Sequence, residues 1–376
     1  MSEFFLYGTL LDRDLLQIVL GADPDGRLTP AQWPGWQAYW AQEGLYPIPA
    51  PAPEGQAEGF VLTDVTPIER ARMHFYEAAF YYLPKPIEVV TEAGPRQVQV
   101  YVPDRDIGTP GAPWSITEWQ DKRGAMSREA ARDVMSRFGK MTQEEFRSSI
   151  GMRRARAASR ISASQDPTPR VLGNSRRRNE VHVTRAWQPY SDFFAIESRI
   201  LNHPTYTGGR SEDLRRSVFI GTDAVIVLPY DPVADRVLLV EQFRCGPFVR
   251  GDIHPWTIEA VAGNIDPGET PEEAAHREVR EEAGLALQSL ISVSRAYAST
   301  GNSSDFFNSY VGLCDLSDVV SGFYGQEDEG EDIRTLILDY AEFQDFLASP
   351  EANVVPLLQI GFWLQANRAR LRGQAG

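Results

Sequence analysis

Residues 263–285 read GNIDPGETPEEAAHREVREEAGL, and this stretch decides the fold of the second half of the chain. Its first part is a glycine-bounded loop. Thr270 then precedes Pro271, an order that suits a helix N-cap followed by proline at the first helical position. Gly284 has the usual place of a residue that ends a helix. The stretch therefore predicts a loop that leads into a helix from about 271 to 283.

Three glutamates project from one face of this predicted helix. Glu278, Glu281 and Glu282 lie three and four residues apart, so their carboxylates occupy adjacent positions. Like charges at this spacing weaken a helix unless a cation lies among them. Carboxylate oxygens are hard ligands that select Mg²⁺ or Mn²⁺ over Zn²⁺. The alternative is a solvated acidic helix face, and the long spaced pattern around the acids argues against it.

The whole stretch fits Gly-x5-Glu-x7-Arg-Glu-U-x-Glu-Glu-x-Gly-U, with U aliphatic, and resembles the Nudix box at every position. The resemblance implies an α/β/α sandwich that hydrolyses a nucleoside diphosphate linked to another group. Arg277, with Glu269, would orient the acidic cluster, and Arg277 and Glu282 would serve catalysis. Bound Mg²⁺, or Mn²⁺, would lower the pKa of the attacking water. The metal ligands implied are Glu278, Glu281, Glu282 and the backbone carbonyl of Ala262.

Outside the box, residues 190–371 resemble bacterial ADP-ribose pyrophosphatases. The segment 239–244, LVEQFR, resembles a strand of that family that ends in a substrate-binding arginine, here Arg244. The segment 326–334, QEDEGEDIR, resembles its acidic loop. By this match Glu329 would be the general base on the water, and Glu331 a further metal ligand. The resemblance thus implies hydrolysis of ADP-ribose to AMP and ribose 5-phosphate.

Two alternatives to this function stay open. Thr300 stands where ADP-ribose pyrophosphatases usually have a proline, so a broader nucleoside diphosphate sugar pyrophosphatase is the first. The second is a non-catalytic module that senses ADP-ribose. The relatives are typically homodimers that exchange N-terminal strands, and residues 193–216 are the segment that would supply them here.

The N-terminal region resembles the γ-glutamylcyclotransferase-like (AIG2-like) family, a small β-barrel fold, over roughly the first 105 residues. Glu77 matches its catalytic glutamate, whereas Ala78 and Leu83 depart from its pattern. The region is therefore expected to be either a second enzyme or a docking module. The pairing of the two domains resembles the tellurite-resistance protein TrgB group. The family's substrate-binding loop matches Tyr7, Gly8, Thr9 and Leu10.

Length and composition agree with two globular domains. The chain has 376 residues, a formal net charge of −15 and two cysteines. The acidity argues against a nucleic-acid surface, and the cysteine count fits a reducing compartment. Without a signal sequence or a long apolar run, we expect a cytoplasmic protein with no membrane partner. The fold class expected is α+β, divided into a domain at 1–110, a helical connector and linker at 111–178, and a Nudix domain at 179–376.

Two shorter stretches carry expectations of their own. The proline-rich segment 47–53, PIPAPAP, is expected to be a loop or an extended surface segment, because proline lacks a backbone donor. The basic run 152–156, MRRAR, is expected to be a solvated helix face.

Overall fold

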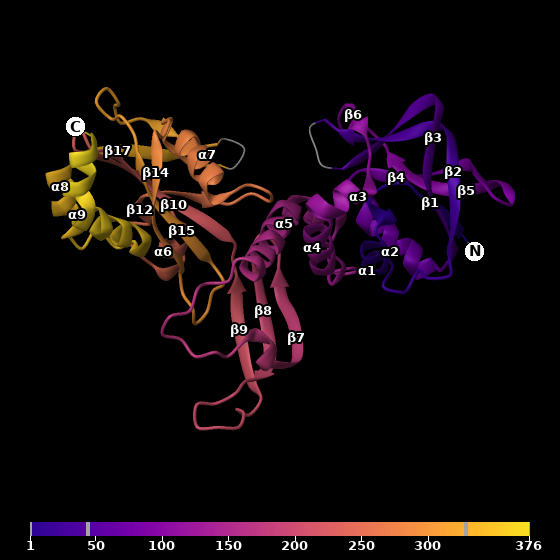
Figure 1. Cartoon of the computed structure of the whole chain (residues 1–376), viewed down its shortest axis with the longest axis horizontal. Helices are drawn as coiled ribbons and strands as arrows, with labels where there is room; N and C mark the ends of the chain where they lie inside the picture. Colours follow the sequence, from indigo (N-terminus) through magenta and orange to yellow (C-terminus); the bar gives the residue numbers. More distant parts are fainter. Residues whose placement is uncertain (1, 43–45, 327–329, 376) are drawn as a thin grey trace. The chain divides into compact units, whose positions relative to one another are not determined.

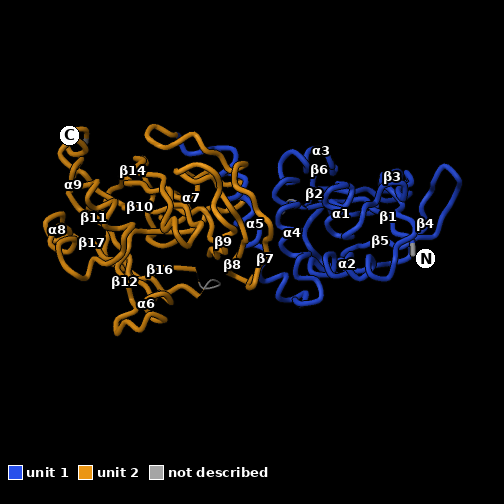
Figure 2. The backbone as a smooth tube through the Cα atoms, turned by 90° about the horizontal axis from the view of Figure 1, so that it is seen from below, with its two compact units in different colours: residues 1–169 blue, residues 170–376 orange. Residues whose placement is uncertain are grey.

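The computed structural model of the chain describes residues 2–42, 46–326 and 330–375 (Figure 1). The chain divides into two units, Met1–Pro169 and Arg170–Gly376 (Figure 2). The division falls in the polar, proline-containing segment that the sequence predicts as a linker. In the described part of the chain, no helix is long and apolar enough to cross a membrane.

The first unit is built on a closed β-barrel. Its strands follow the order β3-β1-β5-β4-β2-β6, and a further pairing of β3 with β2 closes the barrel. This confirms the small barrel expected from the N-terminal sequence. The strands are β1 Ser2–Leu6, β2 Leu28–Ala41, β3 Pro47–Val65, β4 Tyr82–Thr91, β5 Gly94–Pro103 and β6 Pro110–Pro113.

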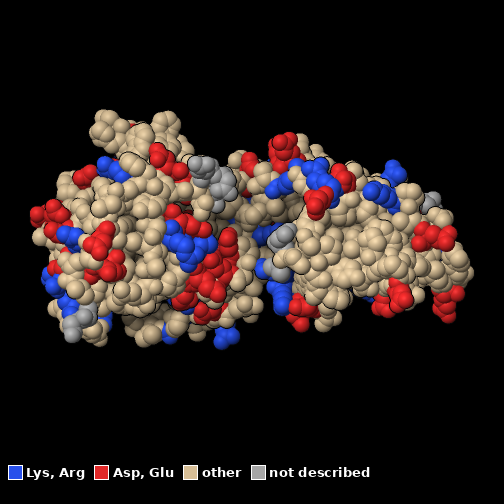
Figure 3. Space-filling model, turned by 90° about the horizontal axis from the view of Figure 1, so that it is seen from above, with Lys and Arg blue, Asp and Glu red and all other residues tan. Residues whose placement is uncertain are grey.

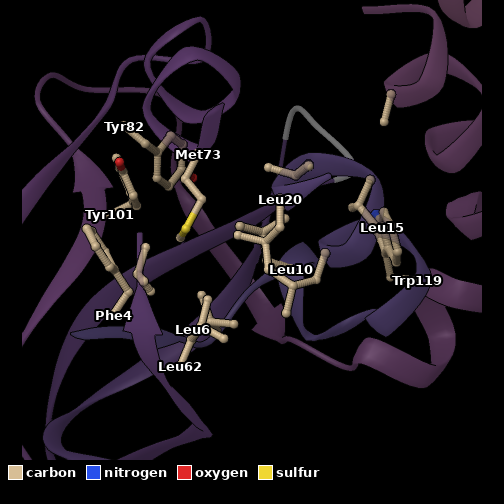
Figure 4. Packing of buried hydrophobic residues seen from close by; sticks show 14 residues of the cluster. Phe4, Leu6, Leu10, Leu15, Leu20, Leu62, Met73, Tyr82, Tyr101 and Trp119 are labelled. Carbon is tan, nitrogen blue, oxygen red and sulfur yellow. The ribbon is translucent and has the colours of Figure 1, made fainter. Parts of the chain in front are cut away.

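Alternation along β1 gives the first unit two buried clusters. Phe4 and Leu6 pack with Met73 and residues of the first helices (Figure 4). Phe5 and Tyr7, the residues that alternate with them in sequence, pack in a second cluster with residues of the other barrel strands. Successive residues of a strand point to opposite faces, so one short strand joins the barrel interior to the helical layer.

The helices of the first unit pack on one another as well as on the barrel. Phe75 and Ala79 share a buried cluster with Val134 and Phe146. The segment expected to be a separate connector therefore contributes α4 (Ala125–Met135) and the first part of α5 (Gln143–Gln165) to the core of the first unit. The helices are η1 Thr9–Leu11, α1 Arg13–Leu20, α2 Pro67–Ala78, α3 Ile116–Trp119, η2 Gln120–Gly124, α4 Ala125–Met135 and α5 Gln143–Gln165.

An ion pair is buried between α4 and α5. The side chain of Arg153 is 0% exposed and pairs with Asp133. Arg156 also donates to Asp133, over 3.3 Å. The expectation that the run 152–156 forms a solvated face is therefore wrong for these two arginines, because a partner from a distant part of the sequence stabilises their charges inside the unit.

The proline-rich segment forms the first part of β3. It pairs antiparallel with β2, with Pro47 opposite Trp40, Pro49 opposite Ala38 and Pro51 opposite Trp36. An antiparallel strand directs the N–H groups of every second residue away from its partner. Prolines at alternate positions therefore remove no donor from the hydrogen bonds between β2 and β3. The segment is a paired strand rather than a loop.

The second unit contains two sheets. The larger follows the path β14-β15-β10-β11-β17-β16, with β12 on β11 and β13 on β10, and the smaller has the order β7-β8-β9. The strands of the larger sheet are β10 Asp223–Asp231, β11 Arg236–Phe243, β12 Trp256–Glu259, β13 Val261–Asn264, β14 Ser289–Tyr297, β15 Phe306–Leu313, β16 Phe323–Tyr324 and β17 Ile333–Asp339. The smaller sheet consists of β7 His182–Ser191, β8 Ala195–Asn202 and β9 Leu214–Ile220.

Helices cover both faces of the larger sheet. On one face Val225, Val240 and their neighbours pack against Ala275 and Val279 of α7. On the other face Leu239 packs with residues of α8 and α9. Figure 1 shows this helix–sheet–helix order, which confirms the α/β/α sandwich that the sequence predicts. The helices of this unit are η3 Arg178–Glu180, α6 Cys245–Arg250, α7 Pro271–Ala283, α8 Tyr340–Leu347 and α9 Val355–Ala375.

Candidate active site

The acid-bearing helix α7 has the limits that its sequence predicts. Thr270 is the N-cap, and its hydroxyl accepts a hydrogen bond from the backbone N–H of Glu273. The carboxylate of Glu273 in turn accepts from the backbone of Thr270, which completes a capping box. Gly284 ends the helix with φ of 63°. These local signals fix the helix, and with it the rotation of its acidic face.

Arg277 gathers three carboxylates. Its Nε and Nη2 donate to Glu269 over 3.0 and 2.9 Å. Its Nη1 donates to Glu278 over 2.7 Å and to Glu281 over 3.0 Å. The hydrogen bond to Glu269, together with the neighbouring negative charges, raises the pKa of Arg277. The structure therefore joins Arg277 and Glu269 as expected, and one guanidinium nitrogen holds Glu278 and Glu281 together.

Glu278 and Glu282 lie against strand β13. Glu282 is 2% exposed and accepts a hydrogen bond of 3.2 Å from the backbone N–H of Ala262. Glu278 covers Gly263, where an added Cβ would lie 2.0 Å from its carboxyl carbon. Burial raises the pKa of Glu278 to about 7 and that of Glu282 to about 8. Burial thus favours the neutral form of both carboxylates and outweighs the opposite effect of Arg277 on the pKa of Glu278.

The donor set around β13 fits a hard divalent cation. It consists of carboxylate oxygens beside the backbone of strand β13, and at Gly263 the lack of a side chain leaves the room that Glu278 occupies. Among residues 2–42, 46–326 and 330–375, no three His, Cys, Asp or Glu side chains are already arranged to hold an ion. Arg277 contacts one oxygen of Glu278 and one of Glu281, which leaves the second oxygen of each carboxylate for an ion.

Arg244 stands at the end of β11 and forms an ion pair with Glu259 of β12. Its Nη2 donates to Glu259 over 2.8 Å, and its Nε contacts both carboxylate oxygens. Burial lowers the pKa of Arg244, but Glu259 and the charges of Glu282 and Glu331 outweigh burial and raise it. The predicted substrate-binding arginine therefore lies within the electrostatic field of the acidic cluster.

The acidic loop brings Glu331 to the same region. Glu331 accepts a hydrogen bond of 3.1 Å from the backbone N–H of Gln326, and its charge raises the pKa of Glu278 and Glu282. Glu329, expected to be the general base, lies outside the described residues. Figure 3 shows acidic side chains gathered beside basic ones on the surface of the second unit.

The predicted residues of the first unit also come together. The Tyr7 hydroxyl donates to the carbonyl of Tyr101 over 2.9 Å, and Glu77 raises the pKa of Tyr7 in addition to the effect of burial. Gly8 leads into η1, which holds Thr9 and Leu10. An added Cβ at Gly8 would lie 2.9 Å from the ring of Pro47. The loop thus needs glycine at this position.

Glu77 lies near the end of α2 among tyrosines. Burial raises its pKa to about 8, although part of the residue stays accessible to water. Its charge contributes to the raised pKa values of Tyr76, Tyr82 and Tyr101. The carboxyl group is therefore largely neutral at pH 7, and a neutral carboxylic acid can donate a proton.

Sequence reasoning missed the residues that support both sites. Glu259 holds Arg244, and Tyr82 and Tyr101 surround Glu77. A glutamate between apolar residues just before the box indicates that a partner cation lies nearby. The two tyrosines carry no comparable signal, because aromatic residues are common in strands.

Comparisons with known proteins agree with the two units. A family described as "NUDIX domain" matches residues 221–358, and one described as "Gamma-glutamyl cyclotransferase, AIG2-like" matches residues 4–121. An ADP-ribose pyrophosphatase of Escherichia coli (strain K12) is 33% identical over 201 residues, which are 52% of this chain and 93% of that protein. The ADP-ribose pyrophosphatase of Haemophilus influenzae is 31% identical over 186 residues, 49% of this chain and 85% of its own length. A GDP-mannose pyrophosphatase of Yersinia enterocolitica is 30% identical over 121 residues, 32% of this chain and 63% of its own length.

Proposed function

Because the chain belongs to the Nudix family, we propose that its second unit hydrolyses the diphosphate bond of ADP-ribose and releases AMP and ribose 5-phosphate. The observation that carries the proposal is the convergence of Glu278 and Glu282 of α7 on the backbone of Ala262 and Gly263. The choice of ADP-ribose is supported by relatives named ADP-ribose pyrophosphatase that match this unit over most of their length.

Mg²⁺ is the ion we assign to this site, because every donor is a hard oxygen. When bound, it would polarise the diphosphate, neutralise charge on the leaving phosphate and lower the pKa of the attacking water. No imidazole or thiolate that would favour zinc belongs to the proposed ligand set. The proposed ligands are Glu278, Glu281, Glu282, Glu331 and the carbonyl of Ala262.

The chain's own residues would orient the substrate and the water. Arg277, fixed by Glu269, keeps the carboxylates of α7 within reach of one another. Arg244 uses Nε and Nη2 on Glu259, which leaves Nη1 for a phosphate oxygen. We assign Glu329 the role of general base that takes a proton from the attacking water, as its place in the acidic loop suggests.

A broader nucleoside diphosphate sugar pyrophosphatase is the second candidate. Two observations favour it: the relatives include a GDP-mannose pyrophosphatase, and Thr300 replaces a proline that is usual in ADP-ribose pyrophosphatases. The turn around Thr300 is formed nonetheless, since the backbone N–H groups of Asn302 and Ser303 donate to the carbonyl of Ser299. The shape of this turn therefore does not distinguish the two candidates.

A substrate panel with purified full-length protein tests the proposal. ADP-ribose, GDP-mannose, UDP-glucose and NADH are each supplied with Mg²⁺, and AMP release is followed for ADP-ribose. We expect ADP-ribose to give the highest kcat/KM and Glu282→Gln to lose at least about a hundredfold in kcat, because a carboxylate ligand becomes a neutral amide. Glu272→Gln is the control, since Glu272 is an exposed acid of α7 that contacts Tyr310. Similar rates on all four compounds would support the broader enzyme instead.

The second unit is proposed to work as a homodimer. The smaller sheet exposes Phe193, Phe194 and Ile196 to 54%, 48% and 38%. Apolar side chains grouped in this way favour contact with another protein surface. A mass near twice that of the chain in sedimentation would support the dimer, and a mass of one chain at micromolar concentration would exclude it.

The first unit is proposed to be a γ-glutamyl cyclotransferase. The neutral carboxyl group of Glu77 beside the Tyr7–Leu10 loop favours an enzyme over a docking module. The α-amino group of a γ-glutamyl amine would attack its own side-chain carbonyl, and Glu77 would pass a proton to the departing amine. Formation of 5-oxoproline by the wild type but not by Glu77→Gln supports this activity. Equal amounts from both would leave the docking module as the better interpretation.

A further inference from the structure

The side-chain amide of Gln242, in β11, contains a buried donor that forms no hydrogen bond with the described residues. The residue is 6% exposed, and its Nε2 atom has no hydrogen-bond partner within the described parts of the chain. A buried donor left unpaired destabilises the folded state, and native proteins contain few of them. An apolar side chain of similar size would avoid this cost, and a ligand that accepts from the amide would offset it.

Gln242 lies between a core residue and an arginine near the acidic cluster. Val240, two residues earlier, packs against α7. Because strand residues two apart share a face, Gln242 lies on the same side of the sheet as the acid-bearing helix. Arg244 follows two residues later, within the field of Glu282 and Glu331. Gln242 therefore lies between Val240 of the core and Arg244, on the face of the sheet that α7 covers.

Two polar side chains of β12 on this face form hydrogen bonds with residues other than Gln242. Thr257 lies opposite Gln242 in the β11–β12 pair, and its hydroxyl donates to Glu259 over 2.5 Å. Both carboxylate oxygens of Glu259 also accept from Arg244. Both groups already take part in hydrogen bonds with other residues, and an oxygen of a bound molecule can supply Gln242 with an acceptor of its own.

We infer that the side-chain amide of Gln242 donates a hydrogen bond to a diphosphate oxygen of the bound nucleotide, beside the contact made by Arg244. The inference rests on the proposed function, which places a diphosphate between these residues and the acids of α7. A neutral donor there adds a directional contact without drawing the carboxylates out of place. Gln242 is in this way a substrate-binding residue that determines affinity for the diphosphate.

The chain offers a matched control in Gln344 of α8. Its Nε2 is also buried and has no partner among the described residues. The helix α8 covers the opposite face of the sheet from α7, with Phe343 and Leu347 in the cluster there. Replacing either glutamine by leucine removes an unpaired donor, and only Gln242 lies on the face of the sheet that α7 covers.

The experiment measures stability and substrate affinity in the full chain. For Gln242→Leu we expect a Tm without nucleotide equal to or above that of the wild type, because no internal hydrogen bond is lost. We expect KM for ADP-ribose to rise about tenfold with a smaller change in kcat, and a smaller Tm increase with the non-hydrolysable α,β-methylene analogue. For Gln344→Leu we expect the same effect on Tm without nucleotide, with KM and the analogue response unchanged.

Gln242→Met, closer to glutamine in length, repeats the test with less change in shape. An unchanged KM and an unchanged analogue response in either folded Gln242 variant would overturn the inference. Failure of both variants to fold would also overturn it, because the amide would then have a structural role. Absence of ADP-ribose hydrolysis by the wild type would instead refute the proposed function, and the analogue response would still decide the role of Gln242.

Discussion

The carboxylate of Glu278 lies over the α-carbon of Gly263, so close that an added Cβ would be 2.0 Å from its carboxyl carbon. Gly263→Ala must therefore displace Glu278 from β13. We expect a loss of about a hundredfold in kcat/KM with little change in secondary structure, because a shift of about 1 Å at a reacting centre has an effect of this size. Steady-state kinetics and circular dichroism check both parts.

Gly373→Ala is the control for that substitution, because an added Cβ at Gly373 meets nothing within 4 Å. It should leave kcat/KM unchanged. Normal kinetics in Gly263→Ala would show that the position of Glu278 does not matter for the reaction.

Arg277→Lys should weaken the response to Mg²⁺. Lysine has one nitrogen, whereas Arg277 holds Glu269 with two of its nitrogens and Glu278 and Glu281 with the third. We expect the Mg²⁺ concentration for half-maximal rate to rise about 10- to 100-fold, the usual effect of losing a residue that orients ligands. Arg280→Lys, an exposed position of the same helix, should behave as the wild type. Identical Mg²⁺ titrations for both variants would refute the orienting role.

Glu77 should make the stability of the first unit depend on pH. Burial raises its pKa to about 8, above the unfolded value of 4.5, so between these values the folded state binds a proton that the unfolded state has released. Stability therefore falls as pH rises from about 5 to 8. Glu77→Gln, neutral at every pH, should exceed the wild type by about 2 kcal/mol at pH 8.5 and match it near pH 4. This difference in unfolding free energy is smaller than the raised pKa of Glu77 alone would give, because the side chain keeps partial access to water.

Amide exchange in α2, measured at several pH values, checks the effect in the first unit alone. A wild-type free energy of opening that rises with pH above 5 would contradict the sign. The same slope in Glu77→Gln would assign the effect to another group.

Asp133→Ala should unfold the first unit more easily. It leaves the buried charges of Arg153 and Arg156 without this partner, and loss of one partner of a buried pair costs about 3–5 kcal/mol. Glu129→Ala removes an exposed pair with Arg132 on the same helix and should cost less than about 1 kcal/mol. Urea unfolding compares the two variants, and equal midpoints would mean that the buried pair does not stabilise the unit.

Local signals explain which parts of the structure the sequence predicts. The limits of α7 follow from Thr270, Pro271 and Gly284, because caps act within one helical turn. The acidic face follows from the same helix by spacing alone. The barrel and the sandwich could also be predicted, because the resemblance of each half of the chain to a known family covers long stretches with many matched positions.

Contacts between distant residues explain what the sequence does not predict. The sequence predicts that Arg153 is exposed to solvent, because nothing in it identifies Asp133, twenty residues earlier, as the partner of this arginine. The pairing of Pro49 with Ala38 depends on the register of β2 and β3. The unpaired amide of Gln242 is visible only once all its neighbours are placed.

The alternating prolines of β3 spare the barrel a row of unsatisfied backbone donors. Pro47, Pro49 and Pro51 direct their nitrogens away from β2, and none of these nitrogens carries a hydrogen. Pro47 and Pro49 are buried, where an N–H group without a partner would destabilise the fold. Residues that are unusual in strands thus allow sheet pairing on one side of this segment to end inside the protein.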